Sequence, residues 1–192
     1  MTPPAGRPHL ATQRLRLEPL TREHLEDLVA LDADPEVLRH IWGRALTRDE
    51  VVERWLPVRT RPDADARGLG YWAGRDLAGE FLGWWCLALD DDPTTAELGY
   101  RLHRAAWGRG YATEGSRALL EHAFATLGLA SVWAETMAVN ARSRAVMEKL
   151  GLTHEATRVH RWEDPLPGAE LGEVTYRITR EGWVTGTRGR RR

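Results

Sequence analysis

A glycine-containing loop between a predicted strand and a predicted helix is the most informative stretch of this 192-residue chain. Residues 97–115 read ELGYRLHRAAWGRGYATEG, with Gly108 and Gly110 directly before the helix. Glycine lets the backbone approach a phosphate closely, and the unpaired N–H groups of a helix N-terminus attract anions. Arg109 adds a guanidinium that pairs with phosphate. The loop is therefore expected to bind phosphate, although a helix that needs glycine only for its entry turn has the same pattern.

A second segment, residues 140–152, reads NARSRAVMEKLGL and follows the next predicted strand. Asn140, Ser143, Met147 and Gly151 are spaced three or four residues apart, so they share one helix face. We expect Asn140 and Ser143 to meet the ligand of the first loop, because the start of this helix lies beside the end of its strand. Taken alone, Asn140 is better explained as a helix N-cap.

Short elements must position these residues, and glycine, proline and charge clusters separate them. Thr47 and Glu50 have capping-box spacing, so a helix should start there and stop before Pro57. Period-two alternation and turn residues predict seven strands, at 14–18, 71–75, 80–89, 96–103, 131–137, 152–160 and 173–179. Further helices are predicted from Thr21 to Leu31, from Gly110 to Leu127 and from Asn140 to Leu150.

Composition limits the class of protein. A mass of 21.7 kDa, 42% hydrophobic and 29% charged residues fit one globular domain. The single cysteine, Cys86, excludes a disulfide framework and a cysteine-rich zinc site, so no metal site is expected. A cytoplasmic location is expected for the same reason, because the cytosol keeps thiols reduced. A net charge of −1 and the absence of a long apolar run argue against nucleic-acid and membrane binding. Residues 184–192, which end in RGRRR, are expected to be a flexible basic tail that carries charge without a reading element.

The chain resembles the GNAT acyltransferase superfamily, and within it the branch named after ribosomal-protein N-terminal acetyltransferases. The resemblance rests on WGRGYATE at 107–114 together with the segment 140–152, and extends to TQRLRLEPLTREH at 12–24 and EVTYRITREGW at 173–183. It implies one α/β (α+β) domain over residues 1–183. The central sheet is then mixed, mostly antiparallel and twisted, with about seven strands flanked by helices and a splay between the fourth and fifth strands.

The same resemblance implies how acetyl-coenzyme A binds. The loop 107–112 would hold its pyrophosphate through backbone amides, and its pantetheine arm would pair with the strand that ends near Leu102, where a bulge frees a donor for the oxyanion. Asn140 would contact the pantetheine and Ser143 would lie near the sulfur. The coenzyme-binding residues are then Leu102, His103, Trp107, Gly108, Arg109, Gly110, Tyr111, Ala112, Thr113, Asn140, Arg142 and Ser143.

Direct attack of an amine on the thioester needs a base and a proton donor for the departing thiolate. The catalytic candidates are Glu97, Ser143 and Asn140. Glu97 is the preferred base because it lies on the strand beside the thioester, with Glu135 or water as alternatives. Ser143 is the candidate donor, since Met147 stands where many members carry a tyrosine. Glu80 or the acidic residues 90–92 are candidates to attract a cationic substrate. Tryptophan is by default a core residue, and the alternative is that the acceptor site is lined by Trp42, Trp84, Trp85, Trp133 and Trp162.

The sequence thus predicts an N-acetyltransferase that moves acetyl from acetyl-coenzyme A to a primary amine, on a protein N-terminus or a small molecule. A homodimer is compatible with this interpretation. The alternative is a non-catalytic sensor that binds acyl-coenzyme A. A dinucleotide-binding unit is disfavoured, because Thr113 replaces the third glycine of its motif and a loop separates strand from glycines.

Overall fold

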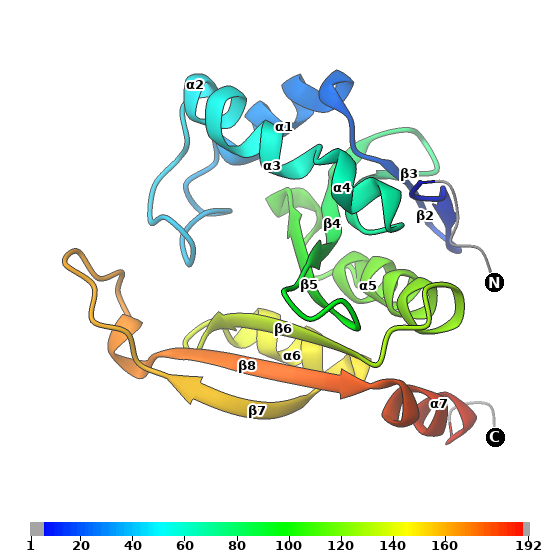
Figure 1. Ribbon diagram of the computed structural model, residues 1–192. Coiled ribbons are helices and arrows are strands. Elements are labelled where there is room, and N and C mark those ends of the chain that lie inside the picture. The colour runs from blue at the N-terminus through cyan, green and yellow to red at the C-terminus, as the bar shows by residue number, and fades with distance from the viewer. Residues whose placement is uncertain (1–5, 190–192) are drawn as a thin grey trace.

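The alternating strands assemble into one eight-stranded sheet with the order β1-β2-β3-β4-β5-β6-β8-β7. The computed structural model describes residues 6–189 (Figure 1). The strands are β1 Leu10–Ala11, β2 Leu15–Pro19, β3 Gly70–Asp76, β4 Phe81–Leu89, β5 Thr95–Leu102, β6 Ser131–Met137, β7 Thr153–Arg158 and β8 Glu173–Thr179. Neighbouring strands are antiparallel except β5 and β6, which are parallel. The seven predicted strands are all present, and the two-residue β1 is the addition.

The helices pack on both sides of the central strands β4 and β5. They are α1 Leu25–Asp32, α2 Arg48–Glu50, α3 Leu56–Arg59, α4 Pro62–Ala66, α5 Tyr111–Glu121, α6 Ala141–Leu150 and α7 Arg180–Gly189. On one side, Leu28 of α1 and Leu56 of α3 share a core with Trp84 of β4. On the other, Leu119 of α5 packs with Trp85. We call these the α1 side and the α5 side of the sheet. No helix within residues 6–189 is long and apolar enough to span a bilayer.

The helix that begins after Thr47 does not stop before Pro57, so that prediction is wrong. The predicted capping box of Thr47 and Glu50 is present. Residues 51–55 then form a π-helical turn, in which the Leu56 N–H donates to the Val51 carbonyl. This wider turn places Pro57 in the first turn of α3, where a missing N–H costs little. The helical run therefore continues to Arg59.

The C-terminal segment also differs from the expected tail. Helix α7 extends to Gly189, so residues 184–189 are helical, and residues 190–192 lie outside the described part of the chain. The Thr179 hydroxyl accepts a hydrogen bond from the Gly182 N–H at 3.1 Å, which satisfies an orphan donor at the start of this helix.

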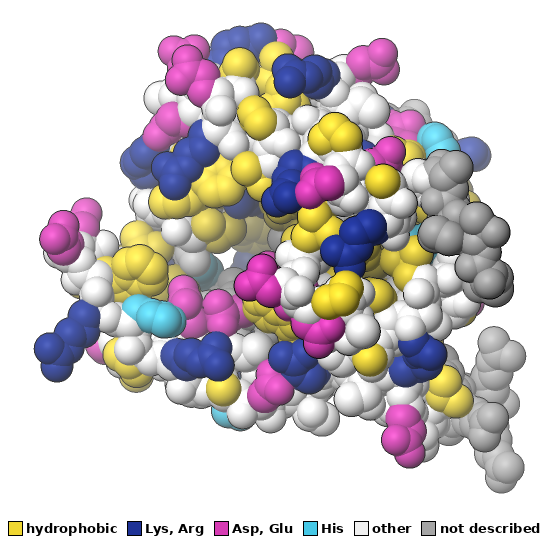
Figure 2. Space-filling model, in the orientation of Figure 1, with side chains coloured by type: hydrophobic (Ala, Val, Ile, Leu, Met, Phe, Trp, Pro, Cys, Tyr) yellow, Lys and Arg dark blue, Asp and Glu magenta, His cyan; other side chains and the backbone are white. Residues whose placement is uncertain are grey.

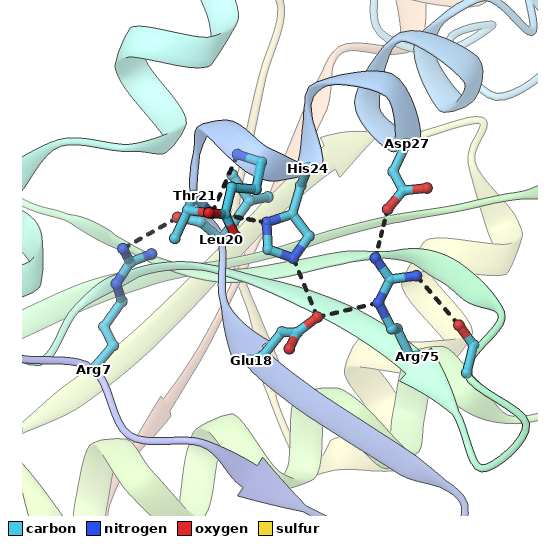
Figure 3. Close-up of polar contacts among 9 residues, drawn as sticks. Arg7, Glu18, Leu20, Thr21, His24, Asp27 and Arg75 are labelled. Atoms are coloured by element: carbon cyan, nitrogen blue, oxygen red, sulfur yellow. Dashed lines mark hydrogen bonds and ion pairs between the residues drawn. The ribbon is translucent and has the colours of Figure 1, made fainter.

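A polar network fastens α1 to the edge of the sheet (Figure 3). The His24 ring accepts from the Thr21 N–H at 3.1 Å and contacts the Glu18 carboxylate at 3.2 Å. Arg75 of β3 donates to Glu18 at 3.1 Å and to Asp27 of α1 at 2.7 Å. Hydrogen bonds from His24 and Arg75 lower the pKa of Glu18. Strands β2 and β3 thus fix the direction of α1.

Candidate active site

The parallel strands β5 and β6 pair at only three positions, and this short ladder opens the sheet. Thr95, Ala96 and Glu97 face Ser131, Val132 and Trp133, and the pairing then ends. Residues 98–102 of β5 have no partner strand on this side, so alternate backbone N–H and C=O groups point into the gap. The predicted splay is thus present. The fourth and fifth predicted strands are β5 and β6 of the structure, because the short β1 comes first in the chain.

The splay, and not a bulge, frees these backbone groups. Pairing between β4 and β5 continues in one register from Gly83 and Leu102 to Leu89 and Ala96. The predicted bulge near Leu102 is therefore wrong. The His103 N–H is not available either, because it donates to the Leu82 carbonyl at 2.9 Å, and the His103 ring packs on Phe81. For contact with a ligand in the gap, His103 therefore has only its carbonyl group and the edge of its ring.

The glycine loop has the conformation that a phosphate-binding loop requires. Gly108 and Gly110 have φ values of +71° and +84°, and Gly110 is the left-handed N-cap of α5. No side chain caps this helix, so the N–H groups of Tyr111, Ala112 and Thr113 have no intrahelical acceptor. A Cβ on Gly108 would meet nothing within 4 Å. The loop therefore offers free donors, a positive dipole end and room for pyrophosphate.

Side chains around the loop brace it and bring the two helix starts together. The Trp107 indole N–H donates to the Leu102 carbonyl at 2.9 Å, and Arg142 of α6 lies 5.3 Å from the Trp107 ring. Arg109 lies over the Tyr111 ring at 5.2 Å, and its carbonyl accepts from Arg14. Tyr111 itself is buried in the core, so its side chain supports the loop from below.

Asn140 and Ser143 stand at the start of α6, as predicted. The Asn140 side chain caps the helix by accepting from the Ser143 N–H at 3.2 Å, and its amide donates to Thr136 at 3.1 Å. Gly151, with φ of +93°, ends the helix as predicted. Met147 is 3% exposed and packs in the α5-side core, so it fills space and offers no proton.

Tyr100 is the residue that the sequence analysis missed. It lies on β5 on the α5 side, and its hydroxyl donates to the Ser143 Oγ at 3.2 Å. Burial raises the pKa of Tyr100, so it keeps its proton at neutral pH. Because Ser143 accepts this hydrogen bond from Tyr100, its own O–H is not used in the contact and can donate to another group. Strand alternation in β5 indicates only which face Tyr100 occupies. The sequence gives no sign of its partner, because Ser143 lies 43 residues away.

Glu97 occupies the apex of the gap, at the last β5–β6 pair. Its side chain is on the α1 side and half-buried. Burial, followed by the nearby charges of Glu135 and Asp90, raises the pKa of Glu97 to about 7. A carboxylate with this pKa is well matched to accept a proton near neutral pH. The Glu135 carboxylate accepts from Thr175 at 2.8 Å and contributes charge beside Glu97.

An open pocket of about 400 Å³ lies on strands β6, β7 and β8, and Trp133, the β6 partner of Glu97, is part of its lining. Figure 2 shows the surface hollowed between the helices and strands β6–β8, with acidic side chains at the rim. Asp90 accepts from the Trp133 indole at 2.6 Å, and Glu155 pairs with Arg177 at 2.8 Å. The pocket is lined by Asp90, Trp133, Glu135, Glu155, Arg158, His160, Thr175 and Arg177.

Of the five tryptophans expected around the acceptor, only Trp133 lines this pocket. Trp85 lies on the α5 side, where its N–H donates to the Ala112 carbonyl at 3.2 Å. Trp42 and Trp84 belong to the α1-side core, and Trp162 is 57% exposed. Core packing, the default interpretation, therefore holds for Trp42, Trp84 and Trp85, and strand alternation sends the neighbours Trp84 and Trp85 to opposite faces of the sheet.

Comparisons with known proteins agree with this geometry. The family model described as "Acetyltransferase (GNAT) domain" matches residues 14–153. The FsC-acetyl coenzyme A-N(2)-transacetylase of Aspergillus fumigatus is 44% identical over 192 residues, covering 93% of this chain and 79% of that protein. A GNAT-family acetyltransferase structure from Bacillus anthracis shares 19% identity with a TM-score of 0.75, covering 91% and 99% of the two chains. An acetyltransferase structure from Agrobacterium tumefaciens shares 26% identity with a TM-score of 0.67, covering 89% and 94%.

The chain belongs to the GNAT acetyltransferase family. It is an N-acetyltransferase that uses acetyl-coenzyme A. The residues present fit this co-substrate, because the loop at Gly108 and Gly110 leaves backbone donors and open space beside the gap.

Replacing Gly110 by valine should weaken acetyl-coenzyme A binding at least about 100-fold, because a β-branched side chain would stand at the loop's free donors. Calorimetric titration measures the affinity. Gly79→Val is the matched control, since Gly79 has a φ of +91° and open space around it, in the turn between β3 and β4. Both variants bear the same backbone strain, so equal affinities for the two would remove the phosphate-loop assignment.

Proposed function

We propose that this enzyme acetylates the amine of a small molecule, by direct attack of that amine on acetyl-coenzyme A with Glu97 as the general base. The observation that carries the base assignment is the position of Glu97, at the apex of the gap and beside the pocket, with a pKa of about 7. The small-molecule acceptor is supported by the 44% identical relative, whose name specifies acetyl transfer to a nitrogen numbered 2.

The pocket beside Glu97 suits a cationic amine. Within the lining, Arg177 is paired with Glu155, which leaves Asp90 and Glu135 against Arg158. Glu97 adds negative charge next to this lining, because it pairs with Trp133. This acidic balance attracts an ammonium group, and the partly ionised Glu97 removes its proton so that the lone pair can attack. An α-amine with a pKa near 8 needs less assistance than a lysine-like amine near 10.4. The site therefore serves an amine of the first kind at neutral pH.

The reaction requires two proton transfers, one away from the attacking amine and one to the departing thiolate, and we place them on opposite sides of β5. Glu97 on the α1 side receives the first from the amine. On the α5 side, the Ser143 O–H donates its proton to the departing thiolate and takes one from the Tyr100 O–H, which already contacts it. The proton of the arriving ammonium passes through Glu97 to solvent, so Glu97 is free to take the proton that the attacking nitrogen loses. After the products leave, solvent takes this proton from Glu97 and returns one to Tyr100, which restores both groups. The dipole of α6 adds stabilisation, because its N-terminus lies at Asn140. Backbone N–H groups of residues 98–102 are available for the oxyanion.

Glu97→Gln should lower kcat about 10²- to 10⁴-fold and leave acetyl-coenzyme A affinity unchanged, since an amide cannot accept the proton. For the native enzyme, kcat/KM should rise as pH passes about 7, where Glu97 loses its proton. Glu135→Gln should move this rise to lower pH, because removal of a like charge lowers the pKa of Glu97. A pH profile that is identical in the native enzyme and Glu135→Gln would contradict the electrostatic coupling, and unchanged turnover in Glu97→Gln would exclude the base role.

Tyr100→Phe should lower kcat roughly 10- to 100-fold, which corresponds to one lost hydrogen bond to a charged group. Because Tyr100 and Ser143 form one relay, the double variant with Ser143→Ala should lose less than the product of the two single effects. Tyr176→Phe is the control, as the buried Tyr176 donates instead to Glu148 at 3.3 Å behind α6. If the loss of kcat in the double variant, measured by thiol release, equals the product of the two single losses, the two residues act independently and do not form a relay.

A small α-amino amide such as alaninamide should be acetylated with a kcat/KM at least about 10-fold above that of a hexapeptide beginning with alanine. The two acceptors carry the same kind of amine, so the difference isolates the size limit of the pocket of about 400 Å³. Thiol release at saturating acetyl-coenzyme A provides the measurement. Preference for the peptide would instead assign protein N-termini as acceptors.

A further inference from the structure

A buried cluster on the α1 side carries one more positive than negative charge. Asp32, the last residue of α1, is fully buried and accepts from the Arg59 Nη2 at 2.8 Å and the Arg101 Nη1 at 2.5 Å. The side chains of Arg59 and Arg101 are 2% and 8% exposed. Guanidinium groups stay protonated in proteins, so two cations share one carboxylate.

This imbalance is costly. A buried charge without a counter-charge destabilises a fold by several kcal/mol. Among the described residues, no second carboxylate forms an ion pair with Arg59 or Arg101. Burial lowers the pKa of Arg101, and repulsion from Arg59 acts in the same direction while Asp32 opposes both. The second guanidinium therefore calls for a further anion.

Several buried donors in the same cluster have no acceptor among residues 6–189. They are the Arg59 Nη1, the Arg101 Nε and the Trp84 indole N–H. The guanidinium carbons of Arg59 and Arg101 lie 5.3 and 5.1 Å from the Trp84 ring, which places the three donors around one residue. The indole N–H of Trp42 also has no acceptor. Trp42 is near the cluster, because it packs on Trp55, whose ring lies 6.0 Å from the guanidinium carbon of Arg59. All of these groups donate and none accepts.

We propose that Arg59, Arg101 and Trp84 form a binding site for a small anion, a carboxylate or a halide, whose charge balances the second guanidinium. An anion supplies the acceptors that these donors lack, and arginine is the side chain best shaped to hold a carboxylate. The donors are shielded from solvent, which limits the ligand to a small or terminal group.

The same chemistry has two sources, the acceptor molecule or a free ion. Arg101 and Glu97 share the α1 side of β5, and only Gly99, which has no side chain, stands between them on that face. Four residues of strand span about 13 Å. An acceptor with a carboxylate several bonds from its amine would reach both residues, whereas a free halide would neutralise the cluster independently of the acceptor.

Thermal unfolding tests the site without requiring turnover, so its outcome is independent of the proposed function. Sodium chloride and sodium acetate titrations should raise the Tm of the native enzyme saturably, by roughly 5 °C at an anion concentration 100 times Kd. Arg101→Met and Arg59→Met each leave a balanced pair with Asp32, so both should lose this saturable increase. Arg48→Met, which removes a guanidinium from the exposed pair with Glu26, should keep it and reports general salt effects.

Acetylation kinetics distinguish the two sources. For an amine that carries a remote carboxylate, Arg101→Met should raise KM at least about 10-fold while the corresponding amide is unaffected, if the acceptor supplies the anion. Equal KM values for acid and amide, with the Tm effect lost, assign the site to a free anion. The proposal is overturned if the native enzyme shows no saturable increase in Tm, or if the increase persists in both Arg101→Met and Arg59→Met.

Discussion

The end of the parallel ladder after Glu97 is the constraint on which the rest of the site depends. Two strands that separate while still inside a domain leave backbone donors and acceptors that need partners. Each strand leads into a helix, so the gap is flanked by the N-termini of α5 and α6. An extended amide-containing ligand with a phosphate at one end satisfies both features. The fold thus selects the coenzyme through its backbone before any side chain is considered.

Strand alternation then divides the chemistry of β5 between two environments. Tyr100 faces the α5 side, where it contacts Ser143 at the start of α6. Glu97 and Arg101 face the α1 side. In the proposed mechanism, one proton leaves nitrogen and another reaches sulfur, and a strand between the two paths keeps the base apart from the donor. In a helix, side chains three or four residues apart share one face, so Glu97, Tyr100 and Arg101 would not be divided between two sides.

Local features were predictable from sequence because their causes are local. The left-handed Gly110 and Gly151 and the N-cap Asn140 depend on a few neighbouring residues, and the structure confirms them. The π-helical turn before Pro57 and the Tyr100–Ser143 contact depend on packing between distant segments. Likewise, nothing near Asp32 in the sequence indicates Arg101, which follows 69 residues later. Thus the caps of α5 and α6 could be predicted from sequence, and the contact of Tyr100 with Ser143 could not.

This division also explains why the motifs name the reaction but not the acceptor. If the backbone groups of the loop around Gly110 hold the coenzyme, as the uncapped start of α5 suggests, the motif specifies the loop conformation and leaves the acceptor open. The α1 side is built from long-range side-chain contacts on α1 and α3, among them Asp32 and Arg59. Buried charges there lower stability unless they are paired, which makes this cluster a candidate for contact with a ligand. We therefore expect selectivity for the acceptor to depend on side chains of α1, α3 and strands β5–β8, and not on the backbone of the glycine loop.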